Sequence, residues 1–575
     1  MSSCQLVRRS FLGSLAVPAA RSKEASCAGR VGRINLCRPV YTAAASSSFV
    51  SSFRKQLVGN QKGSFLLSIG SWRTTVKPLE QLQFQRRSAM ASAKKDEVKV
   101  YPFYLANKPV TPNQAIEVLN KYTQEVGAKV ARATPEDIDK AIGHAVEATE
   151  AMAELPAFTR QAILEKVVTE VTGRKEEFAR ALCMEAGKAI VDARGEVQRL
   201  IDTFKIAAGE AVRLSGEYLP VDYGPRGKGF QSIVRRFPIG PVSMVSPWNF
   251  PLNLVAHKVA PAIAAGCPFV LKPASRTPIG ALLLGEILSK IEELPPGAFS
   301  ILPCERDGAD LFTTDDRLKL LTFTGSASVG WRMKDRAGKK KVVLELGGNA
   351  ACIVEDLVPD LDGTVARLWF AGFYQSGQSC ISLQRLYVHE KHYEDVKAKL
   401  VEETKKLKKG DPLDEDTKIG PIISEKEAIR MEEWVEKAVK AGGKVLVGGK
   451  RDGVLFDATI LEDVPFKCEV VSEEIFGPIL VISKYSDFKD AIKQANESRY
   501  GLQAGVFTND LNKAFYAYEK LQVGGVLIND GPSTRFDNQP YGGLKDSGIE
   551  REGVKYAIEH MTEPKIMLMR NLGKL

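Results

Sequence analysis

The sequence has no long hydrophobic run and few histidines, and each shortage excludes a class of protein. No stretch approaches the roughly 20 consecutive apolar residues that a membrane-crossing helix needs, so we expect no membrane partner. Histidine occurs five times in 575 residues, and none of the five stands in a context that would pair it with a cysteine. A cysteine protease that uses histidine as its base is therefore a poor match.

The nine cysteines form no paired framework. Their spacing is irregular, and three of them, Cys4, Cys27 and Cys37, belong to the N-terminal segment. A small secreted domain held together by disulfides is excluded, and the other six cysteines suit a reducing compartment.

Positive charge is concentrated at the N-terminus. Residues 1–95 hold 16 lysines and arginines but only two acids, a charge of +14, so residues 96–575 carry −4 of the chain's total of +10. A mildly acidic body argues against a nucleic-acid partner.

Residues 1–95 have the composition of an organelle leader. They are rich in Arg, Ser and Ala and bury too little apolar surface to fold alone, so we expect a disordered transit segment. A mitochondrial address is the first expectation. A plastid address is the second and secretion the third. Both are considered because Arg8 and Arg9 precede the mostly apolar stretch 11–20, which could be a weak signal-peptide core or the front half of a plastid signal. Met90 offers a second start for a cytosolic form.

Downstream, the pattern predicts an α/β fold with two lobes. Residues 134–215 are helical, starting at Thr134-Pro135, a hydroxyl and a proline that suit a helix N-terminus. Strand-like and helix-like segments then alternate over 231–346 and 351–526, which predicts parallel sheets covered on both faces. The predicted strands are 232–237, 242–245, 269–271, 320–323, 341–346, 386–388, 445–447, 479–482 and 505–507, with crossover helices at 259–265 and 280–291. Glycines at 223–229 predict a hairpin turn.

Two junctions from strand to helix are candidates for nucleotide binding. The strand 269–271 leads into Lys272, and the strand 320–323 leads into Gly325 and Ser326. Ligands bind at the carboxyl ends of parallel strands, and a helix that begins after Gly325 offers backbone amides to a phosphate. The G-x-G-x-x-G fingerprint is absent, so an ordinary Rossmann assignment fails, and a plain capped loop is the alternative.

One glutamate interrupts an apolar strand. Glu345 follows Val342-Val343-Leu344 and precedes two glycines. Glutamate is seldom buried without a purpose, and burial raises its pKa toward neutrality, as a general base requires. A structural hydrogen bond is the alternative.

Cys380 is the candidate nucleophile, because it lies in a small polar loop, whereas Cys183 and Cys352 lie on apolar stripes.

Asn249, directly after a strand and flanked by prolines, is either a turn residue or a side chain aimed into a cleft. The segments 473–478 and 540–548 have the composition of a solvated loop and a glycine-rich linker.

In order and spacing, these motifs together resemble those of the aldehyde dehydrogenase superfamily over about residues 100–570. The matching motifs are Pro247–Pro251, Lys272-Pro273, Gly325-Ser326, Glu345-Leu346-Gly347-Gly348, Gly377-Gln378-x-Cys380, Glu474-x-Phe476-Gly477-Pro478 and Pro540-x-Gly542-Gly543. The resemblance implies an enzyme that oxidises an aldehyde to a carboxylic acid. It implies that Cys380 attacks the aldehyde, that Asn249 and the Cys380 amide hold the oxyanion, and that Glu345 activates the water that cleaves the thioester. No metal is required.

The resemblance also implies a dinucleotide cofactor. Its expected contacts are Ser246, Pro247, Trp248, Lys258, Lys272, Ser275, Arg276, Gly325, Ser326, Gly347, Glu474 and Phe476. Many NAD-preferring members have a glutamate where this chain has Ser275, followed by Arg276. Because an acid there would repel a 2′-phosphate, we expect NADP to be preferred, with NAD as the alternative.

The resemblance divides the chain into two doubly wound lobes and a small β element. Residues 96–347 form a Rossmann-like NAD(P)-binding domain, interrupted by a bridging hairpin at 217–237, and 348–545 form the catalytic domain. Together with the hairpin, the C-terminal segment 546–575 is expected to join subunits into a homodimer or homotetramer.

Arg535 resembles an arginine of family members that act on small hydroxylated or anionic aldehydes, and it could bind a carboxylate or phosphate through two hydrogen bonds. We therefore expect a lactaldehyde, succinic semialdehyde or glyceraldehyde type of substrate. Ser379 replaces the arginine of the phosphate-binding members, which argues against a triose phosphate. The alternatives are a CoA-acylating dehydrogenase, against which Glu345 counts, and a non-catalytic binding protein of the same fold.

Overall fold

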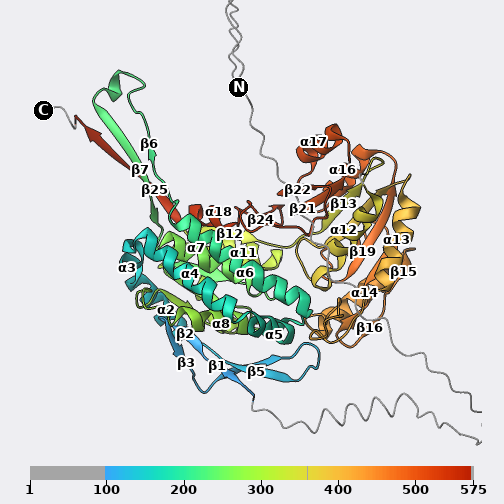
Figure 1. Cartoon of the computed structure of the whole chain (residues 1–575), viewed down its shortest axis with the longest axis horizontal. Helices are drawn as coiled ribbons and strands as arrows, with labels where there is room; N and C mark the ends of the chain where they lie inside the picture. Colours follow the sequence, from blue (N-terminus) through green and yellow to red (C-terminus); the bar gives the residue numbers. More distant parts are fainter. Residues whose placement is uncertain (1–97, 359, 572–575) are drawn as a thin grey trace, which may run out of the picture. The chain divides into compact units, whose positions relative to one another are not determined.

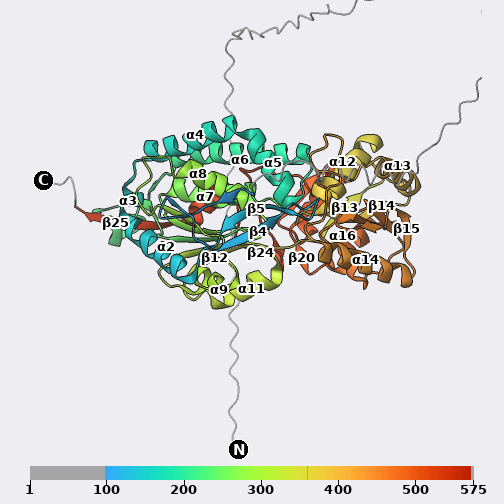
Figure 2. The same cartoon turned by 90° about the horizontal axis from the view of Figure 1, so that it is seen from below.

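Two mainly parallel sheets organise the described residues, 98–358 and 360–571, of the computed structural model. The predicted leader, residues 1–95, and the second start at Met90 lie outside the described residues. Helices cover both faces of each sheet (Figures 1 and 2), and the predicted α/β fold is confirmed.

The first sheet has eight strands in the order β24-β12-β11-β8-β9-β10-β2-β3. Its parallel strands are β8 (Val242–Val245), β9 (Phe269–Lys272), β10 (Phe299–Ile301), β11 (Leu320–Thr324) and β12 (Lys341–Glu345). From β8 the chain adds β9 and β10 on one side, then returns to the other side of β8 to add β11 and β12. The order reverses between β8 and β11, and ligands of α/β proteins bind at the carboxyl ends of the strands at such a switch point.

Antiparallel strands close both edges of this sheet. One edge is formed by β2 (Phe103–Leu105) and β3 (Lys108–Val110), and the other by β24 (Gly548–Ile549). The segment 546–575, expected to serve in subunit contacts, therefore also completes the first sheet.

Helices pack on both faces of the first sheet (Figure 2). On one side lie α4 (Ala157–Gly173), α6 (Ile190–Ala211), α7 (Asn253–Ala265) and α8 (Ile279–Leu288), and on the other α2 (Pro135–Glu147), α9 (Arg306–Ala309) and α11 (Ala327–Arg336). The Thr134 hydroxyl accepts a hydrogen bond from the Asp137 amide, so the expected cap of α2 forms.

Helix α7 begins six residues before the predicted crossover 259–265. All of its residues are buried, including Asn253, His257 and Lys258. A helix that is buried all round shows no amphipathic period, and its polar residues obscured the start. The polar side chains in this buried helix form hydrogen bonds and ion pairs, described below.

The second sheet has seven strands in the order β15-β18-β19-β14-β13-β21-β22. The strands are β13 (Ala350–Val354), β14 (Leu383–His389), β15 (Lys444–Val447), β18 (Thr459–Glu462), β19 (Ile479–Tyr485), β21 (Gln503–Phe507) and β22 (Gly525–Ile528), of which only β15 pairs antiparallel. Its helices are α12 (Leu361–Phe373), α13 (Tyr393–Lys405), α14 (Glu425–Lys440), α16 (Phe488–Asn496) and α17 (Leu511–Lys520). The chain crosses from the first sheet to the second between Glu345 and Ala350.

A third sheet of three antiparallel strands projects away from α18 (Val554–His560) (Figure 1). It consists of β6 (Glu217–Tyr218), β7 (Phe230–Pro238) and β25 (Thr562–Arg570). The glycine-rich turn between β6 and β7 contains the short helix η1 (Pro225–Gly227). The predicted hairpin is thus paired with the C-terminal segment.

The remaining elements are short or peripheral. They are β1 (Val100–Tyr101), β4 (Ala115–Leu119), β5 (Val126–Ala131), α3 (Thr149–Glu154), α5 (Lys175–Ala186), α10 (Leu311–Thr314), η2 (Tyr374–Gly377), β16 (Arg451–Asp452), β17 (Leu455–Phe456), α15 (Glu469–Ser472), β20 (Tyr500–Gly501) and β23 (Leu544–Lys545). Among the described residues, no helix is long and apolar enough to span a bilayer.

Candidate active site

A cleft of about 560 Å³ opens at the switch point of the first sheet and reaches the second lobe. It is lined by 12 of the 16 residues expected from the sequence to form the site: Ser246, Pro247, Trp248, Asn249, Arg276, Gly325, Ser326, Glu345, Gly347, Cys380, Glu474 and Phe476. The first lobe supplies residues at or after the ends of β8, β9, β11 and β12, and the second lobe supplies Cys380, Glu474 and Phe476. The other four, Lys258, Lys272, Ser275 and Arg535, lie outside this lining.

The loop that carries Cys380 has an unusual backbone. Gln375, Ser376 and Gly377 have φ angles of 55°, 54° and 66°, and each non-glycine residue in this region costs on the order of 1 kcal/mol or more. A Cβ atom on Gly377 would lie 2.1 Å from the Gly477 carbonyl oxygen, so only glycine fits there. Such a conformation persists only where neighbouring groups fix it.

Side chains from the first lobe hold this loop. The Gln375 amide N–H donates to Asp192 Oδ2 at 3.2 Å, and Gln375 Nε2 donates to the Asn249 carbonyl at 3.2 Å. In return, Asn249 Nδ2 donates to the Gln378 carbonyl at 3.1 Å. The Asn249 amide and the Cys380 loop are therefore locked to one another across the lobes.

The loop that carries Asn249 is anchored by a glutamate of α6. Glu196 Oε1 accepts from the backbone N–H groups of Leu252 and Asn253, at 2.8 and 3.1 Å, where α7 begins. Its other oxygen pairs with Lys188, and both side chains are fully buried. Glu196 and Asp192 lie one turn apart on α6, so this helix positions both the Asn249 loop and the Cys380 loop.

Cys380 is partly exposed, and its sulfur lies 3.1 Å from the Tyr541 hydroxyl oxygen. Burial raises the pKa of this thiol to about 12, against the stabilising effect of the Tyr541 hydrogen bond. The thiol is therefore mostly protonated near neutral pH, and nucleophilic attack draws on a small thiolate fraction.

Glu345 is buried at the end of β12, with 2% of its surface exposed. Neither carboxylate oxygen has a hydrogen-bond partner among the described residues. Burial raises the pKa of Glu345 well above its ordinary value, and the neighbouring Glu552 carboxylate raises it further. An unpaired buried carboxylate of this kind is suited to take a proton from a water molecule.

The opposite part of the cleft has the form of a dinucleotide site. Ser326 starts α11 without a side-chain cap, so the first amides of the helix are available to a phosphate. Glu474 accepts from the Gly348 N–H at 2.7 Å, and a Cβ on Gly347 would lie 2.5 Å from its carboxylate. Lys272 lies in an adjoining groove of about 760 Å³ that shares Phe323 with the cleft. The donors and the glycine cradle fit an extended cofactor with phosphates in its middle.

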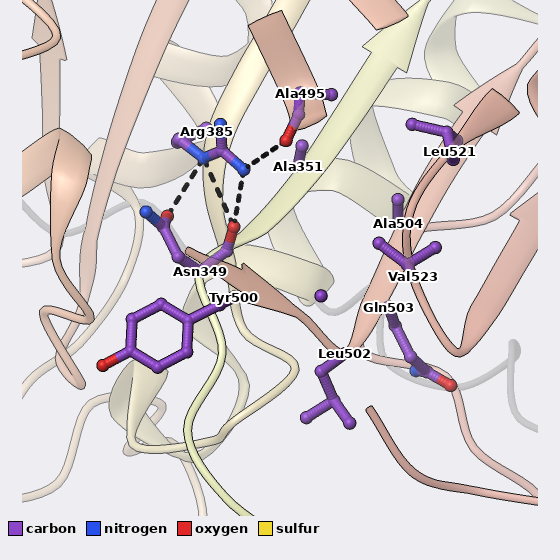
Figure 3. A pocket seen from close by; sticks show the side chains of 11 residues that line it. Asn349, Ala351, Arg385, Ala495, Tyr500, Leu502, Gln503, Ala504, Leu521 and Val523 are labelled. Carbon is purple, nitrogen blue, oxygen red and sulfur yellow. Dashed lines mark hydrogen bonds between the residues drawn. The ribbon is translucent and has the colours of Figure 1, made fainter. Parts of the chain in front are cut away.

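An aromatic pair borders the second lobe's side of the cleft. Trp248 and Phe476 meet edge to face, with ring centroids 5.2 Å apart, although Phe476 has a φ of 55°. Behind this side, the Arg385 guanidinium donates to the carbonyl and the side-chain oxygen of Asn349, at 2.9 and 3.1 Å, and to the Ala495 carbonyl at 3.0 Å (Figure 3). These bonds fix the chain just after Gly347-Gly348 to the second lobe.

Three of the expected residues have other partners. Lys258 is buried, and its Nζ donates to Thr322 Oγ1 at 2.8 Å and pairs with Glu552 at 3.2 Å. The Ser275 hydroxyl donates to the Cys304 carbonyl at 3.1 Å. Arg535 pairs with Glu552 at 3.0 Å, and its guanidinium lies over the Tyr541 ring, 3.7 Å from the centroid.

Behind Cys380 lies a buried charge cluster that the sequence analysis missed, apart from Lys258 and Arg535. The cluster consists of Arg199, His257, Lys258, Arg535, Asp537 and Glu552. Asp537 accepts from Arg199 at 2.7 Å and contacts His257 at 2.9 Å. The signal in the sequence was the His257-Lys258 pair in the middle of a largely apolar helix. The described residues contain no group of three or more His, Cys, Asp or Glu that could hold a metal ion.

Comparison with known proteins identifies the family. The model of the aldehyde dehydrogenase family matches residues 109–567. The 3-sulfolactaldehyde dehydrogenase of Priestia aryabhattai is 43% identical over 476 residues, which cover 82% of this chain and 98% of the relative. The lactaldehyde dehydrogenase of Methanococcus aeolicus is 40% identical over 459 residues, covering 79% of this chain and 97% of the relative.

Solved structures agree with this assignment. Aldehyde dehydrogenase 21 of Physcomitrella patens, solved with its reaction product succinate, is 62% identical with a TM-score of 0.83, and the match covers 84% of this chain and all of that one. A glyceraldehyde-3-phosphate dehydrogenase of Methanocaldococcus jannaschii, solved with NADP, is 38% identical with a TM-score of 0.77, covering 80% of this chain and all of that one. The predicted activity class, oxidation of an aldehyde with NADP or NAD, is confirmed, and the chain belongs to the aldehyde dehydrogenase family.

Proposed function

We propose that the protein oxidises a small anionic aldehyde, with NADP preferred, through a thioester on Cys380. The observation that carries this proposal is the meeting of Cys380, Asn249 and Glu345 in one cleft, with a thiol, an amide donor and an unpaired carboxylate contributed by both lobes.

In the first step, the Cys380 thiolate attacks the aldehyde carbon. The Asn249 side chain and the Cys380 backbone amide donate hydrogen bonds to the oxygen that becomes negative. One such donor is typically worth about 2.7–4 kcal/mol of transition-state stabilisation. The Gln378 carbonyl orients the Asn249 amide by accepting one of its protons.

NADP, when bound in the cleft, supplies the hydride acceptor. Glu345 then takes a proton from a water molecule, and the resulting hydroxide attacks the thioester carbonyl. The carbon–sulfur bond breaks, Cys380 leaves as a thiolate, and the acid is released. A CoA-acylating enzyme needs no water-activating base, so Glu345 favours hydrolysis over the alternative. Adding CoA and measuring acyl-CoA distinguishes the two.

The preference for NADP rests on the chain after β9. Ser275 carries no charge, and the exposed Arg276 side chain lines the cleft, where its guanidinium lies 3.5 Å from Ser424 Oγ. An exposed guanidinium can bind a 2′-phosphate, and position 275 carries no carboxylate that would repel one. We expect kcat/KM to be higher with NADP than with NAD, and Ser275→Glu to reduce this ratio. A strong preference of the parent for NAD would contradict the assignment.

The proposal of an anionic substrate rests on two arginines whose Nε atoms are buried, Arg199 and Arg535. The Nε atoms of Arg199 and Arg535 have no hydrogen-bond partner among the described residues. Arg535 lies over the Tyr541 ring, and the Tyr541 hydroxyl contacts the Cys380 sulfur, so Arg535 is two contacts away from the sulfur. A short acyl chain on Cys380 could thus present its far carboxylate to a guanidinium.

Similar proteins support this substrate class. The relatives named above act on sulfolactaldehyde and lactaldehyde, and the structure of the Physcomitrella patens enzyme holds succinate. We expect Arg535→Ala to raise KM for succinic semialdehyde or lactaldehyde more than for propanal. An equal effect on all three aldehydes would remove Arg535 from substrate binding.

The nucleophile has a direct test. Cys380→Ser should lose turnover with every aldehyde, whereas Cys352→Ser, which changes a buried cysteine of β13, should keep it. Turnover by Cys380→Ser at the parent's rate would refute the mechanism.

We also propose that residues 1–95 direct import into mitochondria and that the third sheet joins subunits into a homodimer or homotetramer. The support is the basic, acid-poor composition of the leader and the exposure of Ile566, Met567 and Leu568 on β25. Imaging of residues 1–95 fused to a fluorescent protein, and light scattering of Leu568→Asp, test the two proposals.

A further inference from the structure

We propose that the Tyr541 hydroxyl is a catalytic group of this enzyme: it donates a hydrogen bond to the Cys380 sulfur and thereby stabilises the attacking thiolate. This inference rests on the proposed role of Cys380 as the nucleophile. It concerns the segment 540–548, which in the sequence looked like a glycine-rich linker.

The contact is direct and enclosed. The Tyr541 hydroxyl lies 3.1 Å from Cys380 Sγ, and Tyr541 is 4% exposed. The tyrosine packs with Ile381 and Leu502 beside the cysteine, so water has little access to the hydroxyl from this side. A sheltered hydrogen bond to a charged group is stronger than one made in water.

The backbone of Tyr541 is fixed by the charge cluster. Its N–H donates to the Glu552 carbonyl at 3.0 Å, and the Glu552 N–H donates back to the Tyr541 carbonyl at 2.6 Å. The Glu552 side chain pairs with Arg535, whose guanidinium lies over the Tyr541 ring. Ring, backbone and counterion thus hold the hydroxyl against the sulfur.

The cation over the ring also strengthens the donor. A guanidinium 3.7 Å from the ring centroid draws electron density from the phenol, which makes its O–H a better donor. Burial nevertheless raises the pKa of Tyr541 well above its ordinary value, so the phenol keeps its proton while the thiol loses its own. The charged groups that act on Cys380 are Glu474, Arg535 and Glu345, and among these only Arg535 favours the thiolate.

The chemistry needs no further reactant. When Cys380 ionises, its proton passes to solvent water, and the Tyr541 O–H points its proton at the sulfur. As the sulfur bonds to the aldehyde carbon, negative charge moves to the oxygen held by Asn249, and the tyrosine remains neutral throughout.

Tyr541→Phe removes the hydroxyl and keeps the ring under Arg535. Thiolate formation is followed by ultraviolet absorbance, with Cys380→Ser as the blank, and by the rate of iodoacetamide labelling from neutral to alkaline pH. We expect the thiol titration to move up by about one pH unit and labelling near neutral pH to slow about tenfold. The two labelling profiles should run parallel below the thiol pKa of both proteins and converge only above it.

The control is Tyr485→Phe, which removes a buried hydroxyl that donates to the Val354 carbonyl in the second sheet, away from the cleft. It should leave the titration of Cys380 unchanged. A purely packing role of Tyr541 would slow labelling by the same factor at every pH, with no shift of the titration. Identical titration curves for Tyr541→Phe and the parent overturn the inference.

The same experiment separates the two proposals. If Cys380→Ser is inactive and unlabelled while Tyr541→Phe titrates like the parent, the nucleophile assignment holds and the role of Tyr541 falls. If Cys380→Ser keeps the parent's turnover, both fall.

Discussion

Two glutamates beside the cleft are equally buried but held in opposite ways. Glu196 on α6 is 0% exposed, and its oxygens accept from two backbone N–H groups and pair with Lys188. Glu345 at the end of β12 is 2% exposed, and neither oxygen has a partner among the described residues. A buried polar group normally has its hydrogen bonds satisfied, so the satisfied carboxylate belongs to the scaffold and the unsatisfied one to the chemistry.

The two regions also differ in what a substitution would do. Around Glu196, side chains hold the Asn249 and Cys380 loops in place, so changes there should reduce stability first. Around Glu345, the cost of burial is already present in the native fold, so changes there should reduce turnover and leave stability intact or improved.

The largest expected effect is on turnover in Glu345→Gln. Loss of a general base typically costs between about 100-fold and 10,000-fold, so we expect kcat to fall within that range. Formation of the thioester should survive, because it precedes the step that Glu345 assists. Rapid mixing with excess aldehyde should show a burst of reduced cofactor followed by slow turnover. A variant without a burst would place Glu345 in the first step instead.

The next effect is on stability in Glu196→Gln. This change leaves the Lys188 ammonium buried without its counterion, which should lower the free energy of unfolding by about 3 kcal/mol. Burial already lowers the pKa of Lys188, so part of the cost is relieved by loss of its proton. Urea unfolding measures the change, and the matched surface variant Glu415→Gln should unfold like the parent.

A smaller effect links Glu345 to pH. Its pKa is raised in the folded state, so the unfolded chain ionises first, and folding loses stability as the pH rises through the folded pKa. The loss begins near the ordinary carboxyl pKa of the unfolded chain, so the parent should lose thermal stability relative to Glu345→Gln as the pH rises from mildly acidic values, and the two should converge in acid. Calorimetry of both proteins across this range gives the difference, and parallel curves would show that Glu345 is not desolvated.

The smallest effect is expected from Asp192→Asn. The Asp192 carboxylate accepts one hydrogen bond from the Gln375 N–H, and the neutral amide of the variant accepts it less strongly. We expect the free energy of unfolding to fall by about 1 kcal/mol. Because that bond supports a loop with left-handed residues, kcat should fall while KM stays nearly constant. A change in KM alone would mean that Asp192 acts on substrate binding.

Much of the cleft could be predicted from the sequence because its residues follow strands. Asn249, Gly325 and Glu345 stand at or after the ends of β8, β11 and β12, and parallel strands bring such positions together. The strands themselves were visible as short apolar runs. Strands such as β13 and β18 were missed, because β13 begins with two alanines and β18 ends in Glu462, and both residue types are depleted in strands.

The charge cluster behind Cys380 could not be predicted in the same way. Arg199, His257 and Glu552 come from distant parts of the chain, and no local pattern indicates that they meet. Lys258, which we expect at the cofactor, lies in the buried helix α7 and pairs with Glu552. The hydroxyl of Tyr541 is similarly hidden, since only the folded chain brings it to the sulfur.

The most direct test of the account is mass spectrometry of Glu345→Gln after mixing with succinic semialdehyde and NADP. Slow hydrolysis should leave one acyl group on the peptide that contains Cys380, and the adduct should disappear when hydroxylamine is added. Reduction of cofactor without any acyl group on Cys380 would contradict the thioester mechanism.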